Sequence, residues 1–287
     1  MQSENKVKVL FIAGTGRNGS TLLSYILGEI PGFINCGEVG RFLYNQRVQL
    51  RNLPCGCGNM VNECGFWKDI LPAIDERTVV MATKMLRVTK LPLLIFPKWK
   101  ARFSRLAKDV EGPYLSIAGL DKKIIVDASK HPFMALLLSY SPNIELYVLH
   151  LIRDPKYVVK SWMRQKKWLS RRRLSSVIAQ VYAYNLLPEV FFRQSRYIKI
   201  NYETFIRFPR STMQMILEWI NIEAEQLPFA DDSHVYLHAQ HTLAGNPDKL
   251  NTGMIEILDK LSKEDKFLSE WLVEILTLPI ARRYGYR

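Results

Sequence analysis

The sequence is poor in cysteine and contains no long apolar run. Only four of its 287 residues are cysteine, which excludes a disulfide-dense scaffold, and a chain of this length can bury a core without such bridges. No stretch approaches the roughly 18 consecutive apolar residues that a membrane-spanning helix needs. The N-terminal segment Met1–Lys6 lacks the basic-then-apolar order of a secretory signal. We therefore expect a soluble, cytoplasmic protein.

Acidic residues are also scarce. The chain has 27 Asp and Glu against 40 Lys and Arg, which gives a net charge of +13. Two segments, Pro97–Lys108 and Leu151–Ser175, together carry an excess of bases equal to that whole charge. Such a concentration indicates an anionic partner, which could be a nucleotide, a polyanion or a membrane surface. One alternative is therefore a non-enzymatic protein that binds nucleic acid or anionic lipid.

Apolar runs rich in β-branched residues alternate with helical patterns along the chain. Strands are expected at Lys6–Ala13, Phe33–Cys36, Lys123–Asp127, Glu145–Ile152 and Tyr197–Ile200. Helices are expected at Ser20–Ile30, within 75–111, at about Pro132–Tyr140, from Asp154 onward, and at Arg171–Arg193, Glu203–Ile220 and Glu264–Ala281. This alternation predicts an α/β fold with a central parallel sheet flanked by helices. We expect one domain over residues 1–287, with a cysteine-rich and helical insert at about 50–112.

A glycine-rich loop, Gly14–Thr21, lies between the first expected strand and helix. It satisfies the pattern G-x-G-x-x-G, and Glu38 follows at the distance typical of a dinucleotide-binding fingerprint. An oxidoreductase that uses NAD(P) or a flavin is therefore a second alternative. The loop also fits a P-loop frame in which Ser20 replaces the lysine, which argues against a nucleoside triphosphatase. What remains is a phosphate cradle of backbone amides and hydroxyl groups, with Arg17 as its positive charge.

A second candidate phosphate site lies in the segment Leu149–Trp162. Arg153 stands at the end of an expected strand, and Asp154-Pro155 is a typical helix start. Ser161 falls on the same helix face as the N-cap, so a guanidinium and a hydroxyl can meet there. Two phosphate sites on one sheet indicate a nucleotide with phosphates at both ends of its ribose.

In order along the chain, these segments resemble sulfotransferases that use 3′-phosphoadenosine 5′-phosphosulfate (PAPS), in particular the bacterial and tyrosylprotein-type branch. Gly14–Leu23 is similar to their 5′-phosphosulfate loop, and Arg153-Asp-Pro with Ser161 to their 3′-phosphate motif. Other similar segments are Cys36-Gly-Glu38, Cys55–Trp67, Asp127-Ala-Ser-Lys130-His-Pro132, Asn201-Tyr202-Glu203-Thr-Phe and His241–Gly253. The resemblance implies a P-loop-NTPase-like three-layer fold. It also implies in-line, metal-independent transfer of the sulfuryl group of PAPS to an acceptor hydroxyl, with adenosine 3′,5′-bisphosphate as product.

The resemblance also implies roles for single residues. Glu38 would be the general base, with His131 as the alternative, while Lys130 and Arg17 would neutralise the leaving phosphate. Residues expected to bind the donor are Gly16, Arg17, Asn18, Gly19, Ser20, Thr21, Arg153, Ser161, Tyr202 and Lys249. The chain differs from the cytosolic steroid and phenol sulfotransferases, because it lacks their loop lysine, their catalytic histidine and their C-terminal Arg-Lys-Gly motif. Lys249 with Gly253 would replace the Arg-Lys-Gly motif.

The partner expected from this resemblance is the hydroxyl group of a small molecule, a lipid or a glycan. No nucleic-acid partner is expected. A peripheral membrane contact and the oligomeric state stay open.

Three of the four cysteines, Cys55, Cys57 and Cys64, cluster in the sequence. We expect free thiols and no metal. The alternative is a zinc site completed by Cys36, although the usual pairs of cysteines two residues apart are missing.

Three histidines, His234, His238 and His241, are spaced like metal ligands on one helix face. No acidic residue accompanies them as in a zinc hydrolase, and the segment 239–247 has the composition of a loop. We expect no metal there either.

Overall fold

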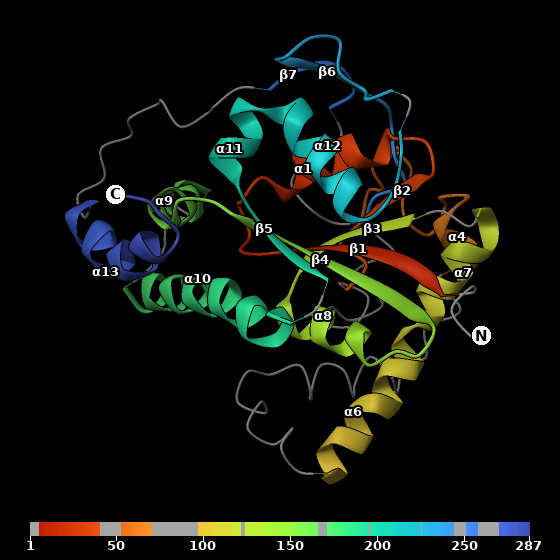
Figure 1. The fold of residues 1–287 in the computed structure, drawn as a ribbon, viewed down its shortest axis with the longest axis horizontal. Helices are drawn as coiled ribbons and strands as arrows, with labels where there is room; N and C mark the ends of the chain where they lie inside the picture. The colour runs from red at the N-terminus through yellow and green to blue at the C-terminus, as the bar shows by residue number, and fades with distance from the viewer. Residues whose placement is uncertain are drawn as a thin grey trace.

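The computed structural model describes residues 6–40, 53–70, 97–121, 124–165, 171–194, 196–224, 226–243, 251–257 and 270–287. At its centre is a parallel sheet in the order β2-β3-β1-β4-β5 (Figure 1). The strands are β1 (Val7–Ala13), β2 (Phe33–Gly37), β3 (Ile124–Lys130), β4 (Ile144–Ile152) and β5 (Tyr197–Asn201). A separate antiparallel pair joins β6 (His234–Leu237) to β7 (Gly253–Glu256).

Helices cover both faces of the sheet (Figure 1). Their bounds are α1 (Ser20–Gly28), α4 (Trp67–Ile70), α6 (Pro97–Val110), α7 (Gly112–Asp121), α8 (Pro132–Ser139), α9 (Pro155–Gln165), α10 (Arg171–Phe192), α11 (Tyr202–Arg207), α12 (Pro209–Trp219) and α13 (Glu270–Arg283). In Figure 1, α1, α11 and α12 lie on one side of the sheet and α6, α8 and α10 on the other. No helix in the described ranges is long and apolar enough to span a membrane.

Strand β1 shows how the apolar pattern builds the core. Val9, Phe11 and Ala13 pack into the apolar cluster that includes α6, α7 and α8. Leu10 and Ile12 pack into the opposite cluster with α1, α11 and α12. Because successive side chains of a strand point to opposite faces, a strand covered on both sides must be apolar at every position. The parallel three-layer α/β architecture, with its P-loop-like fold, is therefore as expected.

The expected helix over Glu203–Ile220 is wrong in one respect, because it consists of two helices, α11 and α12. They are separated at Phe208, whose φ of −133° and ψ of 62° are not helical. Pro209 follows directly, and a proline disfavours helical geometry in the residue before it. The β6–β7 pair and α7 are elements that the sequence patterns did not reveal. Of the helical region expected at 75–111, residues 75–96 lie outside the described residues.

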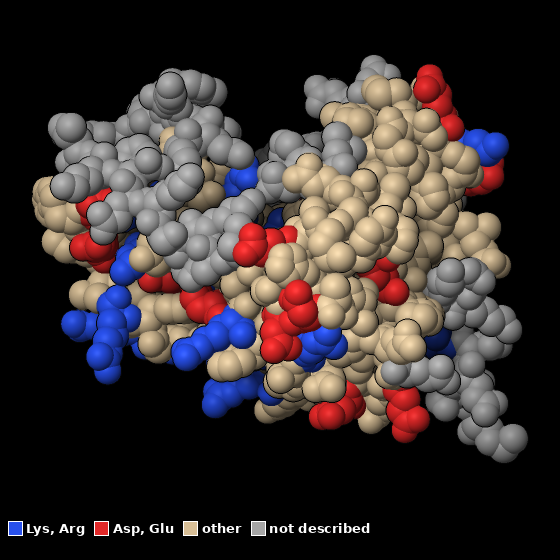
Figure 2. Space-filling model, turned by 90° about the horizontal axis from the view of Figure 1, so that it is seen from above, with Lys and Arg blue, Asp and Glu red and all other residues tan. Residues whose placement is uncertain are grey.

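Part of the positive charge on α9 is balanced within the protein. Lys160 Nζ lies 2.7 Å from a carboxylate oxygen of Glu270 on α13, and Lys156 Nζ lies 3.7 Å from Asp154. Figure 2 shows Lys and Arg gathered on the half of one face that corresponds to the α9, α10 and α13 side of Figure 1, interspersed with Asp and Glu. This face is therefore mixed in charge rather than uniformly basic.

Candidate functional site

The glycine-rich loop leaves the sheet at its middle, because β1 lies between β3 and β4. Asn18 is fully buried and its Nδ2 donates to the carbonyl oxygen of Leu151 at 2.8 Å. Its Oδ1 accepts from the backbone N–H of Ser20 at 3.1 Å. The Asn18 side chain thus holds the loop against the end of β4 and fixes the start of α1.

The turn into α1 requires glycine at position 19. Gly19 has a φ of 90°, and a Cβ atom there would lie 2.3 Å from Cε2 of Tyr202. As the N-cap residue, Gly19 brings no side chain to the first amides of the helix. A helix start of this kind carries partial positive charge and N–H groups suited to an anion. Tyr202, from the start of α11, is thereby placed directly against the loop.

The two expected phosphate sites converge at Arg153, which directly follows β4. Its Nη1 donates to the carbonyl oxygen of Arg17 at 3.0 Å, and its Cζ lies 4.7 Å from the ring centroid of Tyr202. Arg17 itself lies over the ring of Trp162 on α9, with 5.7 Å from Cζ to the centroid. Ser161 is the neighbour of Trp162 on the same helix. The loop and the Arg153–Ser161 segment are therefore side by side.

One donor of Arg153 has no acceptor among the described residues. Its Nε is buried and makes no hydrogen bond to any described part of the chain. A buried donor without an acceptor costs about 1–3 kcal/mol, so native structures rarely keep one without a reason. A phosphate or sulfate oxygen would supply the acceptor and balance the guanidinium charge. The residues present therefore fit an anionic ligand with an oxygen at this point.

A second pair of charged residues lies where β2 and β3 end. Lys130 is the last residue of β3, and Glu38 follows the last residue of β2. The Nζ atom of Lys130 lies 2.7 Å from Oε1 of Glu38 and donates to the carbonyl oxygen of Ala128, also at 2.7 Å. Only 6% of Glu38 is exposed. This buried ion pair lies at the carboxyl ends of the strands, as the glycine-rich loop does, and β3 is the neighbour of β1 in the sheet.

A hydrogen-bond network stabilises the carboxyl ends of β2 and β3. Asp127 is fully buried, accepts from the hydroxyl of Tyr114 at 2.5 Å, and accepts from both the backbone N–H and the hydroxyl of Ser129. Burial raises the pKa of Asp127 to about 6, although the bonds from Ser129 and Tyr114 oppose the shift. Ser129 Oγ in turn accepts from the backbone N–H of Gly40 at 2.7 Å. No pattern in the sequence indicates this network, which holds the turn that follows Glu38.

Backbone conformation singles out two of the candidate residues. Among the described residues, Arg17, Lys130 and Asn221 are the non-glycine residues with positive φ, at 72°, 66° and 55°. Asn221 follows α12, where asparagine commonly ends a helix in this conformation. Arg17 and Lys130 have no such role, and each costs about 1–3 kcal/mol. Strain of this kind clusters at functional sites, and here both residues belong to the expected site.

His131 takes a structural position. It is the N-cap of α8, and its ring packs against the rings of Phe133 and Tyr184, at centroid distances of 5.8 Å and 5.3 Å. Burial lowers the pKa of His131 to about 4. These contacts place His131 in the packing at the start of α8, and the choice of Glu38 over His131 as the base stays a prediction.

The histidine pattern does not form one site. His234 lies in β6, not on a helix, and its Nδ1 is 2.9 Å from Asp231. His238 Nδ1 is 2.7 Å from Glu29. The helix-face geometry considered for the three histidines is therefore wrong. Lys249 lies outside the described residues, so its place relative to the other candidate residues stays a prediction.

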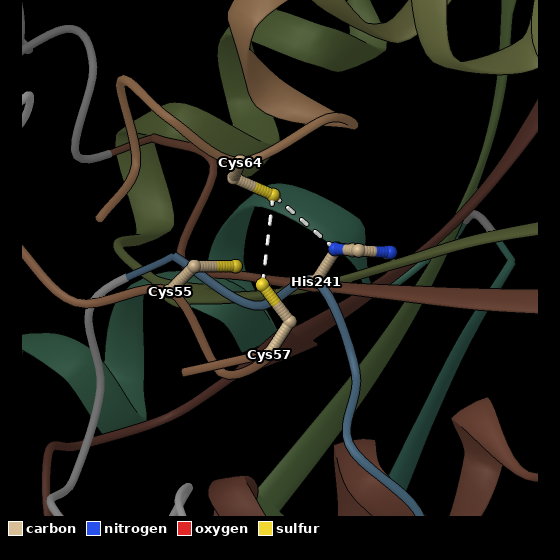
Figure 3. Close-up of side chains that lie close together, drawn as sticks. All are labelled: Cys55, Cys57, Cys64 and His241. Atoms are coloured by element: carbon tan, nitrogen blue, oxygen red, sulfur yellow. Dashed lines mark hydrogen bonds between the residues drawn. The ribbon is translucent and has the colours of Figure 1, made fainter. Parts of the chain in front are cut away.

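The third histidine, His241, instead meets the cysteine cluster. Potential ligand atoms of Cys55, Cys57, Cys64 and His241 all lie within 4.8 Å of one another (Figure 3). Cys36 is not part of this group, so the alternative of a zinc site completed by Cys36 is wrong. Cys36 is instead a buried residue of β2.

Strand order separates this site from a dinucleotide-binding one. In a Rossmann fold β2 lies next to β1, which brings the acidic residue after β2 beside the glycine loop. Here β3 lies between them, and Glu38 is paired with Lys130. The glycine-rich loop and Glu38 therefore do not form the dinucleotide fingerprint that their spacing imitates.

Comparisons with solved structures agree with this topology. The chain is similar to the sulfotransferase domain of the olefin synthase of Synechococcus PCC 7002, with 18% identity, a TM-score of 0.58 and coverage of 100% of this chain and 98% of that one. It is also similar to the sulfotransferase domain of the curacin biosynthetic pathway, with 17% identity, a TM-score of 0.58 and coverage of 99% of both chains. No protein-family model and no curated protein sequence matches it. The chain therefore has the fold of the bacterial sulfotransferase domains.

Proposed function

We propose that the chain is a PAPS-dependent sulfotransferase that moves a sulfuryl group to an acceptor hydroxyl. The observation that carries the proposal is the position of Arg153, which contacts the glycine-rich loop and Tyr202 and has a buried donor that finds no acceptor in the described part of the chain. One nucleotide with phosphates at both ends of its ribose can contact both segments at once. The likeness in fold to sulfotransferase domains supports the same proposal.

The donor would lie along the carboxyl end of the sheet, where ligands of such folds bind. Backbone amides at the start of α1, with Ser20, Thr21 and Arg17, would hold the 5′-phosphosulfate. Arg153 and Ser161 would hold the 3′-phosphate. Tyr202 would pack against the nucleoside, and Lys249 would add a charge near the 3′ end.

The bound donor would supply a sulfuryl group on a phosphate leaving group, and the protein would do the rest with fixed charges. Arg17 and Lys130 would stabilise the negative charge that grows on the leaving oxygen. Glu38 would accept the proton of the acceptor hydroxyl, a step that typically contributes about 10²–10⁴-fold to a rate. Lys130 Nζ, 2.7 Å from Oε1 of Glu38, would hold the carboxylate in place for that step.

A panel of ligands in a thermal unfolding assay tests the proposal. Adenosine 3′,5′-bisphosphate should raise the Tm of the wild type, because a ligand that binds only the folded state stabilises it. Arg153→Ala should lose most of that response. Arg210→Ala is the matched control, since Arg210 also donates to a backbone carbonyl (that of Phe229, 2.9 Å) and lies over an aromatic ring. Stabilisation by NAD alone, or by an oligonucleotide alone, would contradict the proposal.

The acceptor can be identified with PAPS that carries labelled sulfur. The protein is incubated with this donor and a metabolite extract, and the labelled product is isolated. Its chemistry decides between a small molecule, a lipid and a glycan. Transfer to no hydroxyl compound, despite binding of the bisphosphate, would contradict the proposed activity.

A further inference from the structure

The cysteine cluster contains none of the residues assigned to sulfuryl transfer and brings together two distant segments of the chain, 55–64 and the residue His241. Cys55 and Cys57 come from the turn after residue 53, Cys64 precedes α4, and His241 follows β6. Cys55 and Cys64 are fully buried. In Figure 3 the three sulfur atoms and the imidazole point toward a common centre.

The distances match tetrahedral coordination of a metal ion. The sulfur atoms of Cys57 and Cys64 are 3.7 Å apart, and Cys64 Sγ is 3.3 Å from Nδ1 of His241. With a Zn–S bond of about 2.3 Å and a Zn–N bond of about 2.0–2.1 Å, tetrahedral angles give ligand separations of about 3.8 Å and 3.6 Å. A disulfide would instead need sulfur atoms about 2.05 Å apart. We propose that Cys55, Cys57, Cys64 and His241 bind one structural zinc ion.

The ligand chemistry selects the metal. Three thiolates and one imidazole in tetrahedral arrangement suit Zn²⁺, and four protein ligands leave no open position for catalysis. On binding, the three thiols lose their protons to solvent, and neutral His241 donates the lone pair of Nδ1. Three thiolates and the dication leave one net negative charge at the site, and no redox step is involved.

Contacts around His241 hold it in place for this role. Its ring stacks on the ring of Phe66, with 5.1 Å between centroids and 9° between planes. Its carbonyl oxygen accepts from Nε1 of Trp67 at 2.9 Å. Ligands of metal sites are usually oriented by such outer contacts. The stretch Cys64–Trp67 thus supplies a ligand and also orients the histidine.

The turn that carries Cys55 and Cys57 approaches the His241 segment very closely. A Cβ atom on Gly56 would lie 2.2 Å from Oγ1 of Thr242 and 2.6 Å from the hydroxyl of Tyr25. The N–H of Gly56 donates to the carbonyl of Thr242 at 3.0 Å. Glycine between the two cysteines therefore lets the two segments meet, as a shared metal ion requires.

The proposed zinc site is also connected to the carboxyl end of β2, which Glu38 follows. Leu243, two residues after His241, donates to the carbonyl of Cys36 at 3.0 Å and accepts from the N–H of Glu38 at 2.9 Å. A metal ion on His241 would hold this pairing to the end of β2. The zinc site would therefore support the position of Glu38 without touching substrate.

Metal content of the untagged protein, purified under reducing conditions, tests the proposal. The wild type should hold one zinc per chain by plasma mass spectrometry. Replacement with Co²⁺ should give a thiolate-to-cobalt charge-transfer band and the intense visible bands of a tetrahedral ion. Cys57→Ser and His241→Ala should lose most of the metal, whereas Cys36→Ser and His234→Ala, changes outside the cluster, should keep it.

Two further measurements keep the result decisive. His241→Cys preserves four ligands and should retain zinc even where other variants fold poorly. Wild-type protein without bound metal, with all four thiols reactive toward a thiol reagent after unfolding, would overturn the proposal. A mass lower by two hydrogens with Cys57 and Cys64 linked, or iron in place of zinc, would overturn it as well. None of these outcomes depends on sulfuryl transfer, so the zinc site and the proposed function can fail separately.

Discussion

Lys130 Nζ lies 2.7 Å from Oε1 of Glu38, across the adjacent ends of β3 and β2. The pair is mostly buried, with exposed side-chain fractions of 13% and 8%. Removing one partner of a buried pair leaves the other charge uncompensated, which typically costs about 3–5 kcal/mol. Lys130 also carries the strain of its positive φ. The proposed acceptance of a proton by Glu38 beside a fixed cation would give this buried, strained arrangement a role.

Glu38→Gln should abolish transfer and leave binding intact. The amide keeps the shape of the side chain but cannot accept a proton, so we expect kcat to fall about 100-fold or more. Affinity for adenosine 3′,5′-bisphosphate should stay within about twofold of wild type, a difference below about 0.5 kcal/mol. Steady-state transfer assays and calorimetric titration give the two quantities.

Glu111→Gln is the control for that variant. Glu111 is as buried as Glu38, with 6% exposed, but it accepts from Ser141 and Asn143 near the opposite end of the sheet. It should alter stability and leave kcat unchanged. Equal loss of bisphosphate binding and transfer in Glu38→Gln would assign Glu38 a structural role instead.

Gly19→Ala should weaken both the fold and donor binding. An added Cβ meets the ring of Tyr202 at 2.3 Å, and the φ of 90° is strained for alanine. Gly32 has a φ of 87° with no atom within 4 Å of such a Cβ, so Gly32→Ala reports the strain alone. We expect Gly32→Ala to cost about 1–2 kcal/mol of unfolding free energy.

Gly19→Ala should cost more than this control and lower bisphosphate affinity at least tenfold, which corresponds to about 1.4 kcal/mol. Denaturant unfolding and titration measure the two effects. Equal losses of stability in the two variants, with affinity unchanged in both, would show that Tyr202 does not rest on the loop as described.

The free energy of unfolding should decrease as the pH is lowered, because His150 is buried in its neutral form. Burial lowers the pKa of His150 to about 4, and its ring nitrogens contact Tyr197 and Asn185. The unfolded chain takes up a proton below a pKa of about 6.5, whereas the folded chain stays neutral there, so stability is lost as the pH falls through this window. Between about pH 7 and about pH 5 the loss from His150 alone is about 2 kcal/mol.

The variant His150→Gln should reduce that pH dependence, although it is less stable than wild type at neutral pH. Urea unfolding at the two pH values measures the difference. A slope that is the same in wild type and His150→Gln would contradict the burial of a neutral imidazole at this position.

Much of the fold could be predicted from the sequence, because parallel strands that are covered on both faces appear there as continuous apolar runs. All five expected strands are present, with ends shifted by a few residues. The helix break at Phe208 was missed because the apolar pattern continues across Pro209. The β6–β7 pair was missed because each strand has four residues and the two strands are far apart in the sequence.

The meeting of the glycine-rich loop with the Arg153 segment was expected from the sequence, but the pairing of Glu38 with Lys130 and of His241 with the cysteines was not. Arg17 and Arg153 could be chosen because each follows an expected strand. The pairing of Glu38 with Lys130 depends on β3 lying beside β2, and local patterns do not determine strand order. His241 could not be linked to Cys64 for the same reason, since 177 positions separate them in the chain.

The central claim is that Arg153 binds the 3′-phosphate of a nucleotide whose 5′ end lies in the loop that begins at Gly14. Calorimetric titration of wild type and Arg153→Ala with adenosine 3′,5′-bisphosphate and with adenosine 5′-monophosphate tests it most directly. The wild type should prefer the bisphosphate by at least tenfold, about 1.4 kcal/mol, and Arg153→Ala should lose that preference while it still binds the monophosphate. An unchanged preference in Arg153→Ala, or no preference in the wild type, would contradict the account.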